Sequence, residues 1–303
     1  MKQAFIKLHI AVLLAGFTGI LGRLISLEAV ALVWYRVLIA SACFWVLFAW
    51  QRKLQKISNA DIVKLLGIGT VTALHWISFY ASIKFSNVSV GLVCLSCTGF
   101  FTALLEPLLT RKKHQLTEVL LGVLSIIGIY IIFHFDSTFR LGITFGLISA
   151  FLAALFPIFM RQTIQRINIE TGLTWQMTGC ILGTTLLLPV FLQIAPTTHF
   201  VPTTADWFWL LVLAVLCTVV AMQFSMVALK RFSAFTVTLS YNLEPVYGVL
   251  LAFFMFNEME DLGPSFFVGF AIIMSSLVIH TLLLRRQTLK NKQVTAGIQA
   301  GGL

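Results

Sequence analysis

The sequence predicts an all-α integral membrane protein with ten transmembrane helices, arranged as two inverted five-helix repeats. Three observations predict this class: an apolar composition, ten apolar runs of helical length, and a segment that recurs in the second half. Of the 303 residues, 59% are hydrophobic and 11% are charged, and the mean hydropathy is +0.95. A water-soluble domain carries about 25% charged and roughly 45–50% apolar residues. The composition therefore excludes a soluble enzyme, a disordered chain and a disulfide-stapled secreted domain.

Each apolar run is long enough to cross a bilayer. A hydrocarbon core of about 30 Å needs roughly 20 helical residues. The runs do not alternate between apolar and polar residues, as the strands of a membrane barrel would. The first run follows Lys2 and Lys7, as in a signal peptide, but it lacks a small-residue cleavage site, so we expect a retained helix. The basic tail after Leu284 is expected to be disordered. The expected spans are residues 8–25, 30–50, 65–83, 88–109, 119–135, 141–160, 171–193, 207–229, 234–256 and 264–284.

The distribution of Lys and Arg predicts the orientation. With the N-terminus in the cytoplasm, cytoplasmic segments hold 17 of the 21 basic residues. Arg23, Lys84 and Arg140 fall outside, and Arg36 lies within a span. This bias follows the positive-inside rule and predicts a plasma-membrane protein, in bacteria of the inner membrane, with both termini cytoplasmic. It also accounts for the net charge of +10, so no nucleic-acid partner is expected.

The two halves of the chain resemble each other. Residues 84–88 (KFSNV) parallel residues 230–234 (KRFSA), and residues 32–35 (LVWY) parallel residues 173–176 (LTWQ). These pairs predict a first five-helix repeat over residues 1–135 and a second over residues 136–303. Because five is odd, the second repeat enters the membrane from the opposite side, which is a common architecture of secondary transporters.

With these features the chain resembles the EamA-type permeases of the drug/metabolite transporter superfamily. Residues 228–234 (ALKRFSA), 243–247 (LEPVY) and 256–258 (FNE) are similar to the family's run into and along its ninth helix. The first half shows a looser version at residues 82–87 and 101–105. It departs from the pattern at Gly99, where the family has Pro, and at residues 111–112, where the family has Gly-Glu.

The resemblance implies a function and one further site residue. Arg36, in the Trp-Tyr-Arg sequence of residues 34–36, matches an Arg near the start of the family's second helix. The family implies transport of small organic solutes or metabolites without ATP, often as export. Such a fold does not specify which solute is carried.

Charged side chains inside the spans need an explanation, because each costs about 2.5–3.5 kcal/mol at the bilayer centre. Glu244 lies in the middle of its span. It is either a substrate or proton site or a carboxylate that bonds to backbone groups left without a partner by Pro245. Arg36 holds an anionic substrate group, extends to the membrane surface, or pairs with Glu28 or Glu244. Glu106, near a span end, is expected to pair or to extend to the surface.

An aromatic cluster surrounds a mid-span histidine. His75 is followed by Trp76 and, one turn later, by Tyr80. This group could bind an aromatic or cationic solute or relay a proton. A neutral histidine bonded to a neighbouring helix is the structural alternative.

Uncharged residues complete the candidates. Gln176, Gln223 and Asn242 are polar groups inside apolar runs and are candidate substrate contacts. Four aromatic residues are more typical of an interfacial belt, namely Trp34, Tyr35, Trp175 and Tyr241. The Gly-x-x-x-Gly pairs at 142/146 and 179/183 predict close helix packing.

The motifs of other chemistries do not occur in the sequence. There is no phosphate-binding loop, zinc-hydrolase motif or nucleophile elbow, and the five Cys and six His show no metal-ligand spacing. We therefore expect no enzyme, no cofactor and no metal. The expected function is a secondary carrier of small metabolites, amino acids or related amphipathic solutes, working by alternating access and in the export direction, with uptake as the open alternative. Its central cavity would be lined by the spans carrying Arg36, His75, Gln223 and Glu244, with protons as a possible coupling ion through Glu244.

Two other functions stay open at this point. One is a membrane enzyme acting on lipid-linked substrates, and the other is a membrane partner protein that transports nothing.

Overall fold

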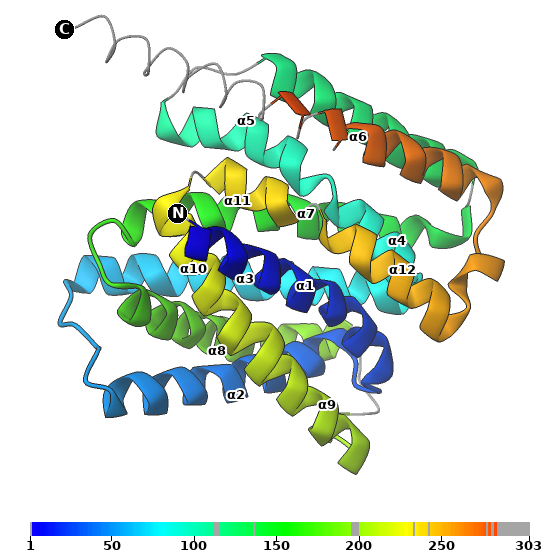
Figure 1. Cartoon of the computed structure of the whole chain (residues 1–303). Helices are drawn as coiled ribbons and strands as arrows, with labels where there is room; N and C mark the ends of the chain where they lie inside the picture. Colours follow the sequence, from blue (N-terminus) through cyan, green and yellow to red (C-terminus); the bar gives the residue numbers. More distant parts are fainter. Residues whose placement is uncertain are drawn as a thin grey trace, which may run out of the picture.

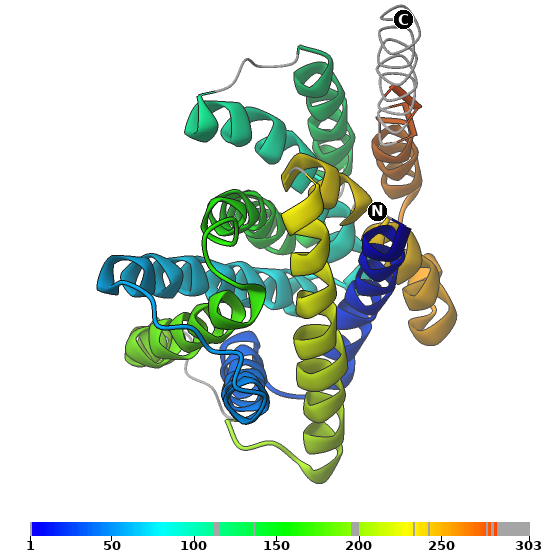
Figure 2. The same cartoon turned by 60° about the vertical axis from the view of Figure 1, so that its left-hand side comes forward.

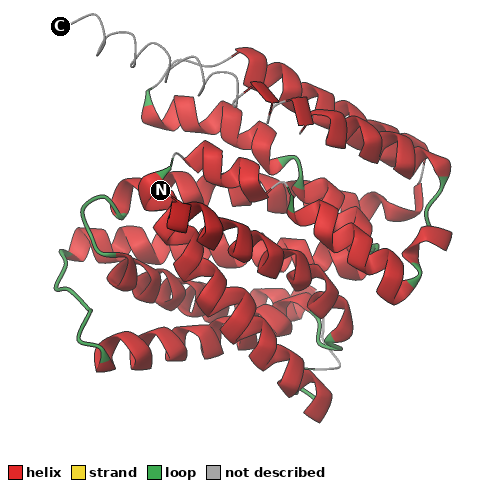
Figure 3. Ribbon diagram, in the orientation of Figure 1, coloured by secondary structure: helices red, strands yellow, loops and turns green. Residues whose placement is uncertain are grey.

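The computed structural model shows a bundle of helices, and no strand occurs among the residues that it describes (Figure 3). Those residues are 2–111, 116–135, 137–194, 200–232, 234–241, 243–276, 278–279 and 282–283. Asn242 and the expected disordered tail after Leu284 lie outside them. In the described part, seven apolar helical segments are long enough to cross a membrane, and three shorter apolar helices accompany them. These ten segments match the ten expected spans.

The helices of the first half are labelled in Figure 1. Their bounds are α1 Lys2–Leu24, α2 Ala29–Trp50, α3 Asn59–Phe85, α4 Val88–Leu95, α5 Thr98–Thr110 and α6 Leu116–Phe135. The fourth expected span is therefore two helices, α4 and α5, which meet at Ser96 and Cys97. The first helix begins earlier than expected, at Lys2, because its polar end continues the same hydrogen-bonded turns.

The second half follows the same plan. After a short 3₁₀ turn, Ser137–Phe139, its bounds are α7 Arg140–Thr163, α8 Ile169–Ile194, α9 Thr204–Ala214, a π-helix Val215–Val220, α10 Ala221–Arg231, α11 Ala234–Tyr241 and α12 Glu244–Phe256. A 3₁₀ turn, Glu258–Glu260, leads to a last apolar helix, Pro264–Ser276. The eighth span is thus α9, the π-helix and α10 in one line, and the ninth is α11 followed by α12.

The repeat extends to the helix breaks. Helix α4 and helix α11 have eight residues each, and α5 and α12 have 13 each. Their starts, Val88 and Ala234, then Thr98 and Glu244, keep the same offset of 146 residues, and so do the left-handed caps Arg111 and Asn257. Broken helices at equivalent positions of two halves are a feature of transporter folds with inverted repeats.

The two halves interlock. Helix α3 packs along α7 and α8, α2 packs against α8, and α1 packs against α10 and α12. Figure 2 shows α1 and α10 side by side. Most extensive contacts therefore join a helix of one half to a helix of the other, and the centre of the bundle lies between the repeats.

Glycine permits the closest of these approaches. A Cβ atom on Gly69 of α3 would lie 2.0 Å from the carbonyl oxygen of Gln176, and one on Gly179 of α8 would lie 2.3 Å from that of Leu66. A Cβ atom on Gly142, Gly146 or Gly183 would also lie within 2.6 Å of a neighbouring helix. Both Gly-x-x-x-Gly pairs therefore pack as predicted.

Replacing Gly69 by Ala should separate α3 from α8 and destabilise the protein by about 3 kcal/mol, the upper part of the usual range for overpacking. The clashing atoms belong to the backbone of α8 and cannot rotate away. Gly67 offers a matched control, because its added Cβ would meet nothing within 4 Å. Thermal unfolding in detergent should show a lowered midpoint for Gly69→Ala and an unchanged midpoint for Gly67→Ala. Equal midpoints would show that α3 and α8 are not held at this distance.

Candidate functional site

A cavity of about 140 Å³ lies between the two repeats. On this measure a water molecule needs about 10–15 Å³, so the cavity has room for several waters or one small organic solute. Helices α1, α2, α3, α4 and α5 of the first half and α7, the π-helix, α10, α11 and α12 of the second half line it. The polar and aromatic lining residues are Thr18, Arg36, His75, Trp76, Phe79, Thr98, Phe156, Ser225, Tyr241 and Glu244.

Arg36 of α2 enters this cavity as a buried cation, with 3% of its surface exposed. Its Nε donates a hydrogen bond of 2.8 Å to the hydroxyl of Thr218, and its Nη1 donates one of 2.8 Å to the hydroxyl of Tyr80. The guanidinium carbon lies 4.0 Å from the centre of the Trp76 ring. Arg36 therefore does not extend to the membrane surface. Within the described residues it pairs with neither Glu28 nor Glu244.

Thr218 owes its position to the π-helix. Its hydroxyl donates a hydrogen bond of 2.8 Å to the carbonyl of Leu213, five residues earlier, while it accepts the bond from Arg36. π-turns inside α-helices are rare and occur frequently at functional sites. Thr218 was not among the residues predicted from the sequence, because neither Pro nor Gly marks the π-turn.

His75 of α3 is tied to α7. Its Nδ1 lies 3.0 Å from the carbonyl oxygen of Ser149, and the Ser149 hydroxyl donates a hydrogen bond of 3.1 Å to the carbonyl of His75. A carbonyl oxygen only accepts, so Nδ1 carries the proton and Nε2 of the neutral ring is an acceptor. His75 thus bonds to a neighbouring helix, which is the structural role considered for it above. It also lines the cavity.

Glu244 stands where the ninth span is broken. It is the first residue of α12, is buried with 6% exposed, and lines the cavity. Pro245 lies in the first turn of α12, where its missing N–H is not needed. The span is therefore two helices, and Pro245 lies at the start of the second instead of interrupting one continuous helix. The repeat equivalent of Glu244 is Thr98, which begins α5 and also lines the cavity.

The carboxylate of Glu244 has no hydrogen bond or ion pair within the described part of the chain. Nearby, the hydroxyls of Tyr241 and Ser225, both lining residues, bond to each other. Glu244 is therefore a buried acid whose partner, when it is charged, has to come from the cavity.

The remaining candidates are placed differently. Trp76 lines the cavity, and Tyr80 supports Arg36 from behind, with none of its surface exposed. Gln176 is buried between α3 and α8, where its amide donates to Thr72, and Gln223 bonds to its own helix at Val219. Neither Gln176 nor Gln223 lines the cavity, although the span of Gln223 does.

At one end of the bundle, which we call the Glu258 end, buried carboxylates join the two halves. Glu258 is fully buried and accepts hydrogen bonds from the backbone of Val88 and Ser89, at 3.1 and 2.9 Å, and from the Ser89 hydroxyl. It also forms an ion pair with Arg23. Asp206 accepts bonds of 2.7 Å from the backbone and the hydroxyl of Ser26. Each carboxylate comes from the second half and holds a segment of the first.

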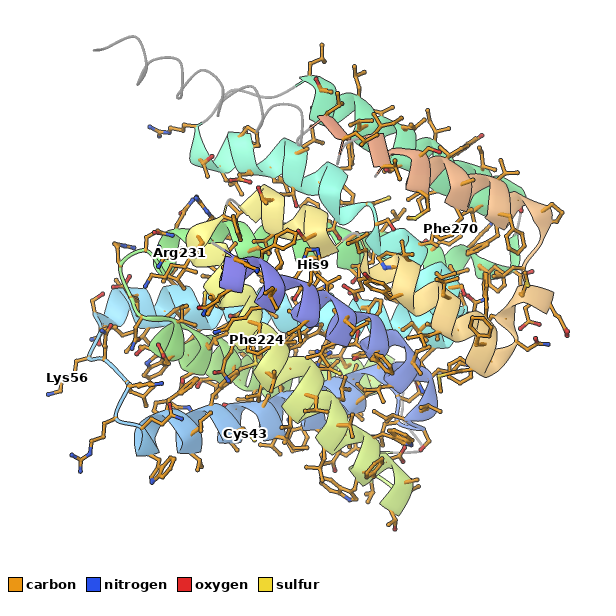
Figure 4. All side chains as sticks on the ribbon, in the orientation of Figure 1. His9, Cys43, Lys56, Phe224, Arg231 and Phe270 are labelled. Atoms are coloured by element: carbon orange, nitrogen blue, oxygen red, sulfur yellow. The ribbon has the colours of Figure 1, made fainter. Side chains whose placement is uncertain are left out.

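The opposite end, which carries Lys56 and Arg231 in Figure 4, lies nearer the cavity. The lining residue Leu229 is two residues from the end of α10, or about 3 Å at the helical rise. Toward the Glu258 end, the lining residues Thr18 and Phe79 are six residues from the ends of α1 and α3, or about 9 Å. We call this opposite end the Arg231 end.

Together, the fold and the cavity define a multi-pass membrane protein that holds a small, mostly apolar cavity with a few polar and charged groups between two repeats. The chain belongs to the EamA-like transporter family, whose model matches residues 3–134 and again residues 140–292. The double match agrees with the broken helices that recur at a fixed offset.

Relatives and a solved structure are consistent with this membership. The chain is 26% identical over 244 residues to an "Uncharacterized transporter" of Archaeoglobus fulgidus, covering 78% of this chain and 82% of that protein. It is 23% identical over 295 residues to the "Uncharacterized transporter YxxF" of Bacillus subtilis, covering 94% and 91%. A crystal structure that is 15% identical covers 94% of this chain and 99% of its own, with a TM-score of 0.65, and shares the fold. The comparisons point to a membrane transporter rather than an enzyme.

Proposed function

We propose that this protein is a secondary carrier of small organic metabolites, amino acids or related amphipathic solutes, that works by alternating access. The observation that carries the proposal is the cavity between the repeats, lined by the buried groups Arg36, His75 and Glu244 and by aromatic and aliphatic walls. Burying unpaired polar and charged groups costs free energy, and a solute that pairs with them would offset that cost. The apolar walls suit the apolar part of such a solute.

Alternating access is supported by the two ends of the bundle. At the Glu258 end carboxylates join the two halves, whereas the cavity lies nearer the Arg231 end. Two halves that enter the membrane in opposite senses can exchange these roles by rocking against each other.

We further propose the plasma membrane, with both termini in the cytoplasm. Among the described residues, most Lys and Arg lie on segments at the Arg231 end, and the positive-inside rule assigns that end to the cytoplasm. Solute would then enter the cavity from the cytoplasm, as export requires. Glu244 would carry the coupling proton, because it is the buried acid in the cavity without a described partner.

Counterflow in liposomes that hold only the purified protein tests the proposal. The vesicles are loaded with a pool of cell metabolites, and exchange is followed by mass spectrometry with and without a pH gradient. We expect one or a few amphipathic metabolites to exchange, and to accumulate uphill when the gradient is present. Protein-free vesicles are the control. If no metabolite exchanges in either condition, the carrier function is wrong, and turnover of lipid in the same vesicles would favour an enzyme.

A further inference from the structure

We propose that the solute is a carboxylate, that Arg36 binds its carboxyl group, and that Thr218 is the positioning residue that aims the guanidinium. This inference rests on the proposed transport function and narrows its substrate class. It starts from the way in which the buried cation is held.

The guanidinium of Arg36 has donors to spare. It carries five N–H groups, and the described residues accept bonds from only two of its nitrogens, Nε and Nη1. Nη2 has no described acceptor, and the side chain lines the cavity. Because one face of the plane is covered by Trp76, a ligand meets the guanidinium most readily at its edge. The edge of a guanidinium is the geometry that binds a carboxylate with two parallel hydrogen bonds.

No carboxylate of the described residues lies within ion-pair distance of the cation, although Glu244 lines the same cavity. The ion pairs of the described residues join Arg23 to Glu258, Lys53 to Glu170 and Arg166 to Asp61, and none of them includes Arg36. The groups that do hold Arg36 are the neutral side chains of Thr218, Tyr80 and Trp76. A buried charge held only by neutral groups is costly, and an anionic ligand removes that cost.

The cavity favours a single negative charge on that ligand. Arg36 is the one Lys or Arg among the described lining residues, and Glu244 would repel a second negative charge. A phosphate dianion is therefore disfavoured relative to a carboxylate. A solute that also carries an ammonium group can be neutralised at Glu244, which fits an amino acid.

Thr218 fixes the direction of the guanidinium. Its hydroxyl is itself held by the carbonyl of Leu213, so the oxygen that accepts from Nε has a defined position. Thr218 lies in the second half, whereas Arg36 lies in the first. The π-helix therefore places an acceptor from one repeat against the anion-binding group of the other. A hydrogen bond to a charged group is typically stronger than one between neutral groups.

The first arm of the test uses the purified full-length protein in liposomes. Counterflow is measured with the metabolite pool and with a pool of alanine, valine, leucine, methionine and phenylalanine, each beside its amide and its decarboxylated amine. We expect every solute that exchanges to carry a carboxylate, with the amides and amines exchanging at least tenfold more slowly. Exchange of an amide or amine as fast as its acid would overturn the inference and leave the carrier function standing. Exchange of no solute would overturn the carrier function itself.

The second arm uses variants. Thr218→Val keeps the shape but removes the acceptor, and we expect about a tenfold rise in KM for the exchanging acids with a smaller preference for acid over amide. Thr218→Ser should restore both values. Thr184→Val is the matched control, because Thr184 is equally buried, bonds only to its own helix and does not line the cavity. Equal losses for acids and amides in Thr218→Val would show a purely structural role and overturn the assignment.

Discussion

Replacing Glu244 by Gln should abolish solute accumulation driven by a pH gradient while leaving counterflow of the same solute measurable. Gln keeps the size of the side chain but cannot take up or release a proton. A carrier that exchanges one proton for one solute supports about a tenfold solute gradient for each pH unit. We therefore expect the accumulation ratio at a gradient of one unit to fall from about ten to one. The measurement is uptake into liposomes under an imposed pH gradient.

Glu106 provides the matched control for this substitution. Like Glu244 it is a buried glutamate that precedes a proline, but it does not line the cavity. The Glu106→Gln protein should keep proton-driven accumulation. Its counterflow rate, compared with that of the unchanged protein, shows whether the variant is folded. A Glu244→Gln protein that still accumulates solute against its gradient would show that the coupling proton binds elsewhere.

Replacing Glu258 by Ala should lower the stability of the protein by about 2–6 kcal/mol, because two buried backbone N–H groups lose their acceptor at about 1–3 kcal/mol each. The change leaves the backbone N–H groups of Val88 and Ser89 without their acceptor and Arg23 without its partner. The first turn of α4 also loses a carboxylate that complements the positive end of the helix dipole. Thermal unfolding in detergent should show a clearly lower midpoint, and Glu258→Gln a smaller shift.

The neighbouring Glu260 is the control for charge alone. It lies in the same short turn, is exposed, and its replacement by Ala should change the midpoint little. If Glu258→Ala unfolds at the same temperature as Glu260→Ala, the contacts between Glu258 and α4 do not stabilise the Glu258 end.

Much of this fold could be predicted from hydropathy, because lipid imposes one requirement on every span. Each run of about 20 apolar residues has to satisfy its backbone groups as a helix. The breaks in the fourth and ninth spans could not be predicted in the same way. At Ser96 and Cys97 no Pro or Gly marks the end of α4, and at Pro245 the sequence is equally consistent with a kink. Contacts between helices inside the bundle decide whether such a span is one kinked helix or two helices, and hydropathy carries no information on these contacts.

The site residues that could be predicted from the sequence are those whose burial in lipid costs much free energy. Inserting Arg36, His75 and Glu244 into lipid costs free energy, and in the structure all three line one cavity. Burying the uncharged amides of Gln176 and Gln223 costs less free energy than burying a charge, and each donates one hydrogen bond inside the protein, although Oε1 of Gln176 has no described partner. Their presence in a span therefore does not show which way they face. Burying Thr218 costs almost no free energy, since its hydroxyl can bond to its own helix.

In the sequence, Glu258 stands out only as part of the Phe-Asn-Glu segment at residues 256–258. Its burial depends on α4 and Arg23, which lie about 170 and 235 residues away in the chain. A local reading of the sequence has no access to contacts at that separation.

In the proposed alternating-access cycle, the contacts of Glu258 would give the two conformations different free energies. Perfectly equivalent repeats would make the two states equally populated and the two half-cycles equally fast. The offset of 146 residues places Lys112 in the sequence where the second repeat has Glu258, so the first repeat cannot supply the same carboxylate to α11. In the proposed alternating-access cycle, the empty carrier would therefore rest with the contacts of the Glu258 end formed. Breaking those contacts would then be the slower half of each turnover, and the difference in free energy would favour picking up the next solute from the Arg231 end.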